Sequence, residues 1–354
     1  MKPSSMVCLL LTALLGVGTS GAAAESASGV SPTTGLPSDK PYRPVLVQVS
    51  NEPGAQPARN LAQADIIYEA IIWEPGQTRY LALYNDNHPE AVGSVRGTRV
   101  YGAELQQAWD CAFAFRGGQD IEGSSIYSFF REYGVSDLLL FDGTADAKQV
   151  FSINSDYVSP HETDVNVAKI AENWPTDSVT GAPYVSRPSG LRFSDQHSTG
   201  VEAVTHIHLQ YDKTGYAPSY LYNAETGLYE RGYDGGLHVD AGTGEQIAVA
   251  NVIVQCNDLY FIKDEPSRPR IPTTNTGPIR AYIDGEVIEG SWIRVSMSDP
   301  IEYRNASGGP LVLKPGKTFV QIVPPLMFDE GTQVRDETAT YTNQFLYDRD
   351  PPDV

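Results

Sequence analysis

Two arginines stand three residues apart in the segment GSVRGTRVYG, as Arg96 and Arg99. If a helix begins near Val95, both guanidinium groups lie on one face close to its N-terminal end, where backbone N–H groups and the helix dipole favour an anion. Guanidinium groups hold a carboxylate or a phosphate through paired hydrogen bonds. The alternative is structural: the two arginines pair with Glu69 and Glu74 and fix the helix to a sheet. Both arrangements remain open, because a paired arginine still offers donors to a ligand.

A glycine pair, Gly117 and Gly118, follows the apolar run CAFAFR. Ligands of open α/β sheets bind outside the carboxyl ends of the strands, and glycines let the backbone approach a ligand closely. The ordinary alternative is a turn that ends a strand. The following segment, GGQDIEGSS, has neither dinucleotide-fingerprint nor P-loop spacing, so no cofactor is expected.

A histidine, His161, lies in the loop sequence VSPHETDV, just before a predicted helix. A loop histidine near arginines and glycines can act as a general base or a ligand donor, although a lone histidine is more often structural. Together with Glu69 or Glu74 it could supply the acid and base of a hydrolase, but no GxSxG elbow accompanies it. The residues expected to line one ligand-binding cleft are Arg96, Arg99, Gly117, Gly118 and His161.

Two histidine-containing pairs have the spacing of neighbours on one strand face. They are His206 with His208 and His238 with Asp240. Such a pair could bind a metal together with a further carboxylate, but it more often lies on an exposed strand face. No metal site is therefore expected.

Tyrosines crowd the first part of the second half. On an exposed β-face they would form a platform suited to sugars or peptides, and the alternative is that they belong to the core. These aromatic residues are Tyr211, Tyr216, Tyr220, Tyr222, Tyr229, Tyr233 and, further on, Trp292.

The overall charge argues against a nucleic-acid partner. The chain has 25 Lys and Arg residues against 44 Asp and Glu residues, a formal net charge of -19. Such a charge repels phosphate backbones and anionic lipid surfaces. A length of 354 residues exceeds what one hydrophobic core usually supports, so two domains are expected.

The first 24 residues resemble a secretory signal peptide. Lys2 precedes a short apolar run, and three alanines ending at Ala24 offer a cleavage site. Cleavage there would release a soluble protein without a transmembrane segment. Cys8 lies inside the apolar run, so we do not expect it to carry a lipid. The remaining cysteines, Cys111 and Cys256, are candidates for a disulfide in an oxidising compartment, with buried free thiols as the alternative.

Strand and helix patterns alternate in the first half, whereas the second half reads almost entirely as strands with turns such as YDGG, IDGE and KPGK. The predicted fold class is α+β, with an α/β N-terminal domain around a mixed sheet followed by a β-rich C-terminal domain. The expected segments are a signal peptide over 1–24, a linker over 25–40, domains over 41–178 and 190–325, and an acidic tail over 326–354.

Several motifs in order resemble the DUF3048 family of YerB-like bacterial envelope proteins. They include NEPGAQPAR, ADIIYE and GSVRGTR in the first half, FRGG at 115–118, and FSINSDYVSPHETDVN around His161. In the second half TGLYERGYDGGLHVDAGTGEQIAVANVIVQ is similar to the family's C-terminal domain. The resemblance covers roughly 40–325. Many members carry a lipobox cysteine at the signal junction, and this chain has Ala-Ala-Ala-Glu there.

The resemblance implies a secreted or envelope-associated protein, but no activity, because the family has none established. From the residues we expect binding of an anionic or carbohydrate cell-wall component in the cleft described above. The alternatives are a hydrolase acting on cell-wall polymer and a structural protein that organises other envelope proteins. The expected partner is cell-wall glycan or peptide, or another envelope protein. Whether the protein is an enzyme stays open.

Overall fold

The computed structural model describes residues 29–73, 76–176, 179–187, 189–212, 215–262 and 265–329. The expected signal peptide and almost all of the expected acidic tail lie outside these ranges.

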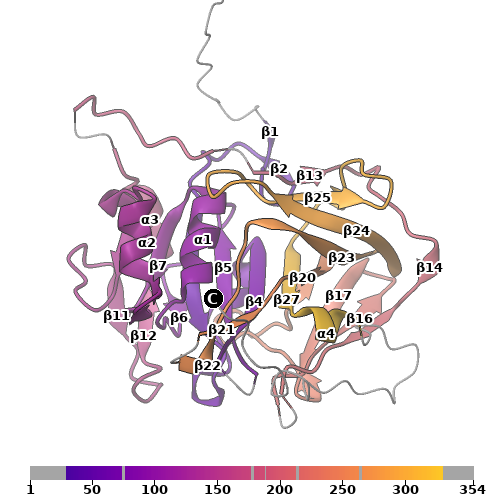
Figure 1. Cartoon of the computed structure of the whole chain (residues 1–354), viewed down its shortest axis with the longest axis horizontal. Coiled ribbons are helices and arrows are strands. Elements are labelled where there is room, and N and C mark those ends of the chain that lie inside the picture. Colours follow the sequence, from indigo (N-terminus) through magenta and orange to yellow (C-terminus); the bar gives the residue numbers. More distant parts are fainter. Residues whose placement is uncertain are drawn as a thin grey trace, which may run out of the picture.

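One sheet of 11 strands runs through both halves of the chain (Figure 1). In spatial order its strands are β10 (Leu140–Asp142), β7 (Ala112–Phe115), β3 (Val45–Ser50), β5 (Gln77–Tyr84), β4 (Ile66–Trp73), β27 (Thr318–Val323), β20 (Asn251–Cys256), β23 (Asn275–Ile283), β24 (Glu286–Arg294) and β14 (Glu202–Ala203), and β25 (Glu302–Asn305) pairs with β24. The two halves meet where β27 pairs in parallel with β4. The sheet therefore does not stop at a boundary between domains.

Most central strands of this sheet point the same way. Strands β10, β7, β3, β4, β27 and β20 are parallel to one another, and β5 is antiparallel to its neighbours β3 and β4. The carboxyl ends of the parallel strands consequently share one edge of the sheet with the first residues of β5. We call this the carboxyl edge.

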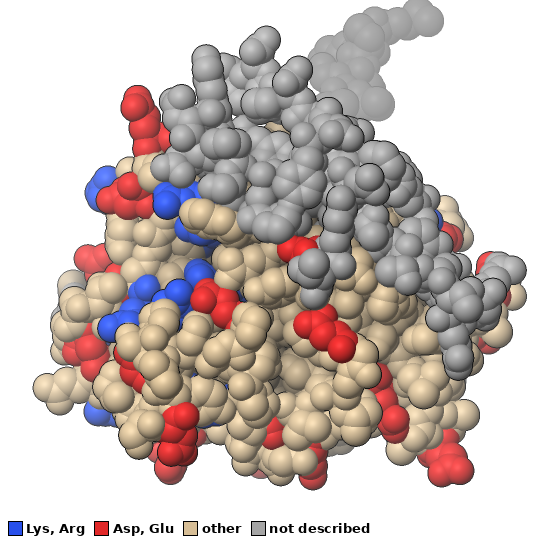
Figure 2. Space-filling view, turned by 90° about the horizontal axis from the view of Figure 1, so that it is seen from below, with Lys and Arg blue, Asp and Glu red and all other residues tan. Residues whose placement is uncertain are grey.

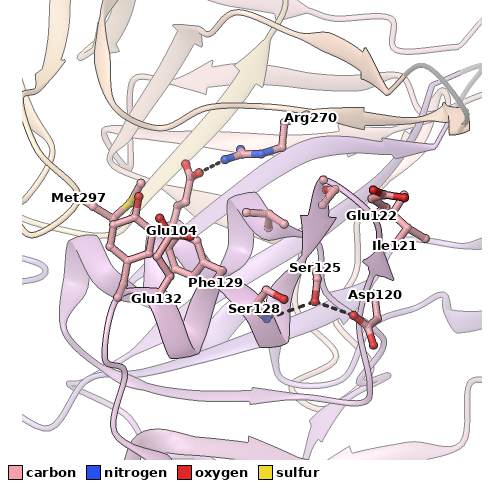
Figure 3. A pocket seen from close by; sticks show the side chains of 14 residues that line it. Glu104, Asp120, Ile121, Glu122, Ser125, Ser128, Phe129, Glu132, Arg270 and Met297 are labelled. Carbon is pink, nitrogen blue, oxygen red and sulfur yellow. Dashed lines mark hydrogen bonds and ion pairs between the residues drawn. The ribbon is translucent and has the colours of Figure 1, made fainter. Parts of the chain in front are cut away.

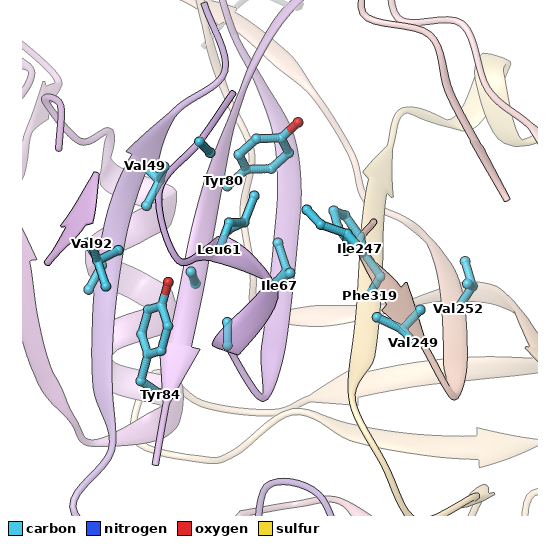
Figure 4. Close-up of a cluster of buried hydrophobic side chains, with 14 of the residues drawn as sticks. Val49, Leu61, Ile67, Tyr80, Tyr84, Val92, Ile247, Val249, Val252 and Phe319 are labelled. Carbon is cyan, nitrogen blue, oxygen red and sulfur yellow. The ribbon is translucent and has the colours of Figure 1, made fainter. Parts of the chain in front are cut away.

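Both faces of the central part of the sheet are covered, which explains why strands such as β3, β7, β20 and β27 are buried throughout. In β4, Ile67 and Ile71 pack into one core and Ile66 and Tyr68 into the other, as alternation along a strand requires. Helices α1 (Val100–Trp109) and α2 (Ile126–Glu132) pack on the second face. The first face is covered by α3 (Val167–Glu172) and by a second sheet, and part of its core is drawn in Figure 4.

The second sheet consists of β15 (His206–His208), β16 (Pro218–Asn223), β17 (Leu228–Tyr233), β18 (Gly236–Leu237) and β19 (Ala248–Val249). A three-stranded sheet is formed by β11 (Phe151–Ile153), β12 (Thr163–Val165) and β6 (Val92–Gly93). Two-stranded pairs are β1 (Gly29–Val30) with β2 (Pro37–Ser38), β8 (Asp120–Ile121) with β9 (Ser124–Ser125), β13 (Arg192–Phe193) with β26 (Val312–Leu313), and β21 (Tyr260–Ile262) with β22 (Glu265–Arg270). The remaining short helices are η1 (Pro53–Ala55), η2 (Leu61–Gln63), η3 (Asp137–Leu139) and α4 (Pro325–Asp329).

The predicted fold class, α+β with an α/β N-terminal domain, is wrong, because the chain is β-rich. The expected helices form, but α1, α2 and α3 have only 10, 7 and 6 residues. The polar segments around them form the additional strands β6, β8, β9, β11 and β12. In addition, the N-terminal strands share their sheet with the C-terminal half, so they do not make a separate α/β layer.

The candidate disulfide between Cys111 and Cys256, both in the described part of the chain, is not formed, and both side chains are buried. Cys111 precedes β7 and packs on one face of the large sheet, whereas Cys256 ends β20 and packs on the other. These strands are five positions apart in the sheet, which at about 4.8 Å per position is roughly 24 Å. A disulfide needs Cα atoms about 4.4–6.8 Å apart.

Part of the tyrosine set belongs to the core, the alternative to an exposed platform. Tyr211, Tyr220 and Tyr229 are fully buried and Trp292 is 2% exposed, whereas Tyr216, Tyr222 and Tyr233 are half-buried. The ring of Tyr220 faces the large sheet, where it contacts Phe319 with ring centroids 5.6 Å apart. The second sheet therefore uses its tyrosines to pack on the first.

Candidate functional site at the carboxyl edge

Arg96 lies between β6 and α1, at the carboxyl edge. Its N–H donates to Gln48 O and its carbonyl accepts from the Arg116 N–H, both at 3.0 Å, so this segment runs between the ends of β3 and β7. Helix α1 begins directly after Arg99. The helix start predicted near Val95 is therefore wrong, and Arg96 precedes the helix.

Four side chains from separate segments meet at this edge, and we call them the Glu52 cluster: Glu52, Arg79, Arg96 and His161. Glu52 Oε1 accepts from Arg79 Nη2 at 2.9 Å and from Arg96 Nη2 at 3.4 Å. His161 Nε2 is 3.7 Å from the other oxygen, Oε2. Glu52 follows β3 and Arg79 lies near the start of β5. Two guanidinium groups thus surround a single carboxylate.

Several donors of the Glu52 cluster are left over. Nε of Arg79 and Nε of Arg96 are buried donors without a hydrogen-bond partner among the described residues, and Nδ1 of His161, the nitrogen turned away from Glu52, also lacks a partner. The Arg79 side chain is 10% exposed and that of Arg96 is 23% exposed. A buried donor without a hydrogen bond raises the free energy of the folded protein. A ligand atom that accepts from this donor removes that penalty, which favours binding.

Charge and burial set the protonation of this cluster at neutral pH. Burial alone would raise the pKa of Glu52, but the hydrogen bond from Arg79 and the charges of Arg79 and Arg96 outweigh it and lower the pKa. Burial lowers the pKa of His161, more than the opposing charge of Glu52 raises it. Glu52 is therefore ionised and the imidazole neutral, which leaves the cluster with a surplus of positive charge.

The loop after β3 makes room for His161. A Cβ atom on Gly54 would lie 2.7 Å from His161 Cδ2, so only glycine permits this approach. On the other side, Arg59 Nη2 donates to His161 O at 3.3 Å, and Arg59 itself pairs with the buried Asp164. The segment between β3 and β4 therefore positions the histidine, although Arg59 and His161 are 102 residues apart in the sequence.

The glycine pair follows β7 beside this segment, as expected, but its immediate contacts are structural. Gly117 has φ +68°, and its carbonyl accepts from the Thr98 N–H at 3.0 Å. A Cβ on Gly118 would lie 2.1 Å from Ile126 Cδ1, so this glycine lets the start of α2 approach. Both glycines therefore shape the backbone next to Arg96.

Arg99 turns away from Arg96, towards the end of β4. Its Nε donates to Ile72 O at 3.3 Å, and its guanidinium lies 5.7 Å from the Trp73 ring centroid. The structure thus brings Arg96 and His161 together, with the glycine pair on the adjacent backbone, and directs Arg99 elsewhere.

Glu69 does not serve either role that the sequence suggested for it. Its carboxylate is fully buried and pairs with Arg231 Nη2 at 2.7 Å, not with Arg96. Asn51, Thr78 and Gln321 also donate to it, at 3.0, 2.7 and 2.9 Å. Because every approach is occupied by protein donors, Glu69 cannot act on a substrate in this structure.

Arg231, on β17, completes a buried polar network between the halves. Its Nε donates to the Tyr220 hydroxyl at 3.2 Å and its Nη1 contacts His238 Nδ1. The guanidinium lies 4.7 Å from the Phe319 ring centroid. Burial and the Arg231 charge lower the pKa of His238 well below its ordinary value, so this histidine is neutral. We call Glu69, Arg231, His238, Tyr220 and Gln321 the Glu69 network.

Of the remaining candidates, Glu74 lies outside the described residues. Asp240 accepts from the backbone N–H groups of Asn60 and Ala62 at 3.1 and 2.9 Å, so it docks the second half onto the first.

Within the part of the chain that the structure describes, no three His, Cys, Asp or Glu residues are placed to hold a metal ion. In the same ranges no helix is long and apolar enough to cross a membrane.

Sequence reasoning missed Glu52 and Arg79. A signal existed for both: Glu52 follows a buried strand, as Gly117 does, and Arg79 is a charged residue inside the otherwise apolar strand QTRYLALY. Figure 2 views the molecule from below, the side on which β22 lies in Figure 1, and shows basic side chains gathered in one part of a mostly uncharged surface with scattered acidic side chains.

Comparisons with known proteins cover both halves. The family model described as "Protein of unknown function (DUF3048) N-terminal domain" matches residues 33–180, and the model of the DUF3048 C-terminal domain matches residues 207–320. The protein named "Putative lipoprotein YerB" from Bacillus subtilis (strain 168) is 29% identical over 304 residues, which are 83% of this chain and 86% of the relative. The crystal structure of YerB protein from Bacillus subtilis matches with a TM-score of 0.69 at 28% identity, and the match covers 84% of this chain and 97% of that chain.

Proposed function

Since this chain belongs to the DUF3048 family, as the sequence resemblance predicted, we propose that it is an exported cell-envelope protein that binds an anionic group of a cell-wall component. The name of its relative, a lipoprotein, is consistent with a place in the envelope. The binding site we propose is the Glu52 cluster.

The observation that carries the proposal is the pair of unsatisfied guanidinium donors at Arg79 and Arg96. They belong to side chains from two separate segments that converge on a partly exposed position. A carboxylate or phosphate oxygen accepts from such donors more strongly than a neutral oxygen does. Because the chain as a whole is strongly negative, only a ligand that contacts these donors directly would overcome the repulsion.

The hydrolase alternative receives less support from the same geometry. Glu69 is closed off by its partners, and Glu52 is held ionised by two guanidinium groups, which makes it a poor proton donor at neutral pH. The neutral His161 could accept a proton, but Glu52, whose Oε2 lies 3.7 Å from it, is held ionised and does not supply the acid.

The test is co-sedimentation of the purified protein with cell-wall sacculi, before and after the anionic polymers have been removed by acid. We expect binding to the untreated sacculi, and a roughly 10- to 100-fold weaker affinity for Arg96→Ala, as loss of a charged hydrogen bond implies. Arg304→Ala, on the exposed strand β25, is the matched control for the loss of one positive charge. Equal binding by Arg96→Ala and the control, or by both kinds of sacculi, would contradict the proposal.

A further inference from the structure

A cavity of about 550 Å³ lies beside α1 and α2 and is lined by none of the Glu52 cluster (Figure 3). Residues from both halves of the chain line it, with Arg270 and Met297 from the second half facing Phe129 and Glu132 from α2. Its size is within the range of small-molecule sites. The lining has three features that together select a ligand.

The first feature is charge. Four carboxylates face a single guanidinium in the lining. The buried Glu104 pairs with Arg270 and accepts two further hydrogen bonds from Thr273, both at 2.7 Å, so these charges are compensated. Three carboxylates remain, and all three are exposed to solvent: Asp120, Glu122 and Glu132. The cavity therefore attracts a cation and repels an anion.

The second feature is an aromatic wall. The rings of Phe129 and Tyr133 lie 4.5 Å apart between centroids, and Tyr133 is 42% exposed. A ring face attracts a cation, and the apolar side chains of Val100 and Met297 offer contacts for methylene groups. This wall suits a cation on an aliphatic stem.

The third feature is a set of serine hydroxyls that position the acceptors of the lining. Ser125 Oγ donates to Asp120 Oδ1 at 2.6 Å and holds that carboxylate in place (Figure 3). Ser124 Oγ, also in the lining, accepts from Nε2 of the buried Gln119 at 2.6 Å. A ligand with several N–H donors would match the carboxylate and hydroxyl oxygens of this lining.

We propose that this cavity binds a primary ammonium group on a short aliphatic stem. An ammonium carries three donors and one positive charge, so it satisfies the carboxylates and the ring face at once. A neutral sugar would use the same acceptors but leave the charge uncompensated. The site is independent of the proposed function, because its charge is opposite to that of the Glu52 cluster and it shares none of its residues.

The test is titration of the purified protein with 1,5-diaminopentane, followed by saturation-transfer NMR, with 1,5-pentanediol as the uncharged ligand of equal length. We expect the diamine to bind and the diol not to. Nα-acetyl-lysine amide carries a single ammonium group on an aliphatic stem, as a lysine side chain in a peptide does. Its binding would show that one ammonium group is sufficient, whereas binding of the diamine alone would show that both are needed.

Variants locate the binding. Glu122→Gln combined with Glu132→Gln should weaken diamine affinity roughly four- to 25-fold, at about two- to fivefold per exposed carboxylate. Glu225→Gln combined with Glu245→Gln removes the same charge from exposed positions in the second sheet region and should leave the affinity unchanged. Tyr133→Leu, at a partly exposed ring, should weaken binding without loss of folding, which the thermal unfolding midpoint checks.

Three results would overturn the proposal. One is equal binding of diol and diamine. Another is an unchanged affinity in the Glu122→Gln and Glu132→Gln variant. The third is binding of N-acetylglucosamine at the cavity with no binding of the diamine, which would assign the site to a sugar. Arg96→Ala should have no effect on the diamine, so failure here leaves the proposed function untouched.

Discussion

The Glu69 network and the Glu52 cluster are both built around a glutamate and an arginine, but only the Glu52 cluster is open to solvent. In the network, the side chains of Glu69 and Arg231 are 0% exposed, and each oxygen of the carboxylate has protein donors. In the cluster, Glu52 is 20% exposed and Arg96 23% exposed, and donors are left over.

This difference separates a structural ion pair from a site that can take a ligand. A closed pair crosses from β4 to β17 and joins the two halves of the chain, so its loss should affect folding. An open cluster at the carboxyl edge has spare donors, so its loss should affect binding. The distinction is one of satisfied hydrogen bonds, not of residue type.

The largest effect we expect is the loss of stability in Arg231→Met. The change leaves the Glu69 carboxylate buried without its cation, which costs about 3–5 kcal/mol of unfolding free energy. Denaturation in urea measures it. Arg304→Met, in a pair that is 44% exposed on the arginine side, should cost less than about 0.5 kcal/mol.

A double variant sharpens this prediction. Adding Glu69→Met to Arg231→Met removes both charges, so it should recover part of the lost stability, although Asn51, Thr78 and Gln321 then lose their hydrogen bonds to Glu69. If Arg231→Met were as stable as Arg304→Met, the Glu69 network would not join the halves, and the comparison with the Glu52 cluster would fail.

Much of the local structure followed from the sequence. Apolar runs such as PVLVQVSN and CAFAF became β3 and β7, and the segment RGTRVYGAELQQAW contains α1. The fold class could not be predicted in the same way, because it depends on a long-range strand pairing. Strands β27 and β4 are more than 240 residues apart, and the local sequence of a strand does not indicate with which strand it pairs. Short strands such as β11 and β12 carry too few residues for a periodic signal.

The candidate site was predicted in part. Placing Arg96 and the strand-ending Gly117 at one carboxyl edge of a sheet needed only the element pattern and the rule that ligands meet carboxyl edges, although the helix start expected at Arg96 was wrong. The choice of partner was missed, because Glu52, Glu69 and Glu74 are equally plausible in sequence. Burial decides between them: β4 turns Glu69 into the core, whereas the loop after β3 leaves Glu52 at the surface.

The second prediction concerns pH and His238 in the Glu69 network. Its pKa is lowered in the folded protein by burial and by Arg231, so the folded state stays unprotonated while the unfolded state gains a proton below pH ~6.5. His238 therefore lowers stability as the pH falls from ~6.5, by at most about 1.4 kcal/mol per pH unit. The unfolding free energy, measured between pH 7 and pH 5, should fall less steeply in His238→Gln.

The protonation of Asp65 changes stability with pH in the opposite direction, so its contribution must be separated from that of His238. Burial, with the Asp86 charge, raises its pKa to about 7, so the folded state binds this proton first and stability rises as the pH falls towards 4. The comparison of His238→Gln with the wild type cancels this contribution, since Asp65 is present in both. Identical slopes in the two proteins would mean that His238 is protonated in the folded state.

The smallest effect, and the one that tests the open cluster most directly, is expected for Glu52→Gln. The amide keeps the size of the side chain but removes the charge that competes with an anionic ligand for Arg79 and Arg96. Affinity for untreated sacculi should therefore rise, by about two- to fivefold for one partly exposed charge. Because the pKa of Glu52 is lowered, the wild type remains ionised at pH 5, and the difference between the two proteins should persist there. A weaker affinity in Glu52→Gln would show instead that the carboxylate holds the guanidinium groups in their binding geometry.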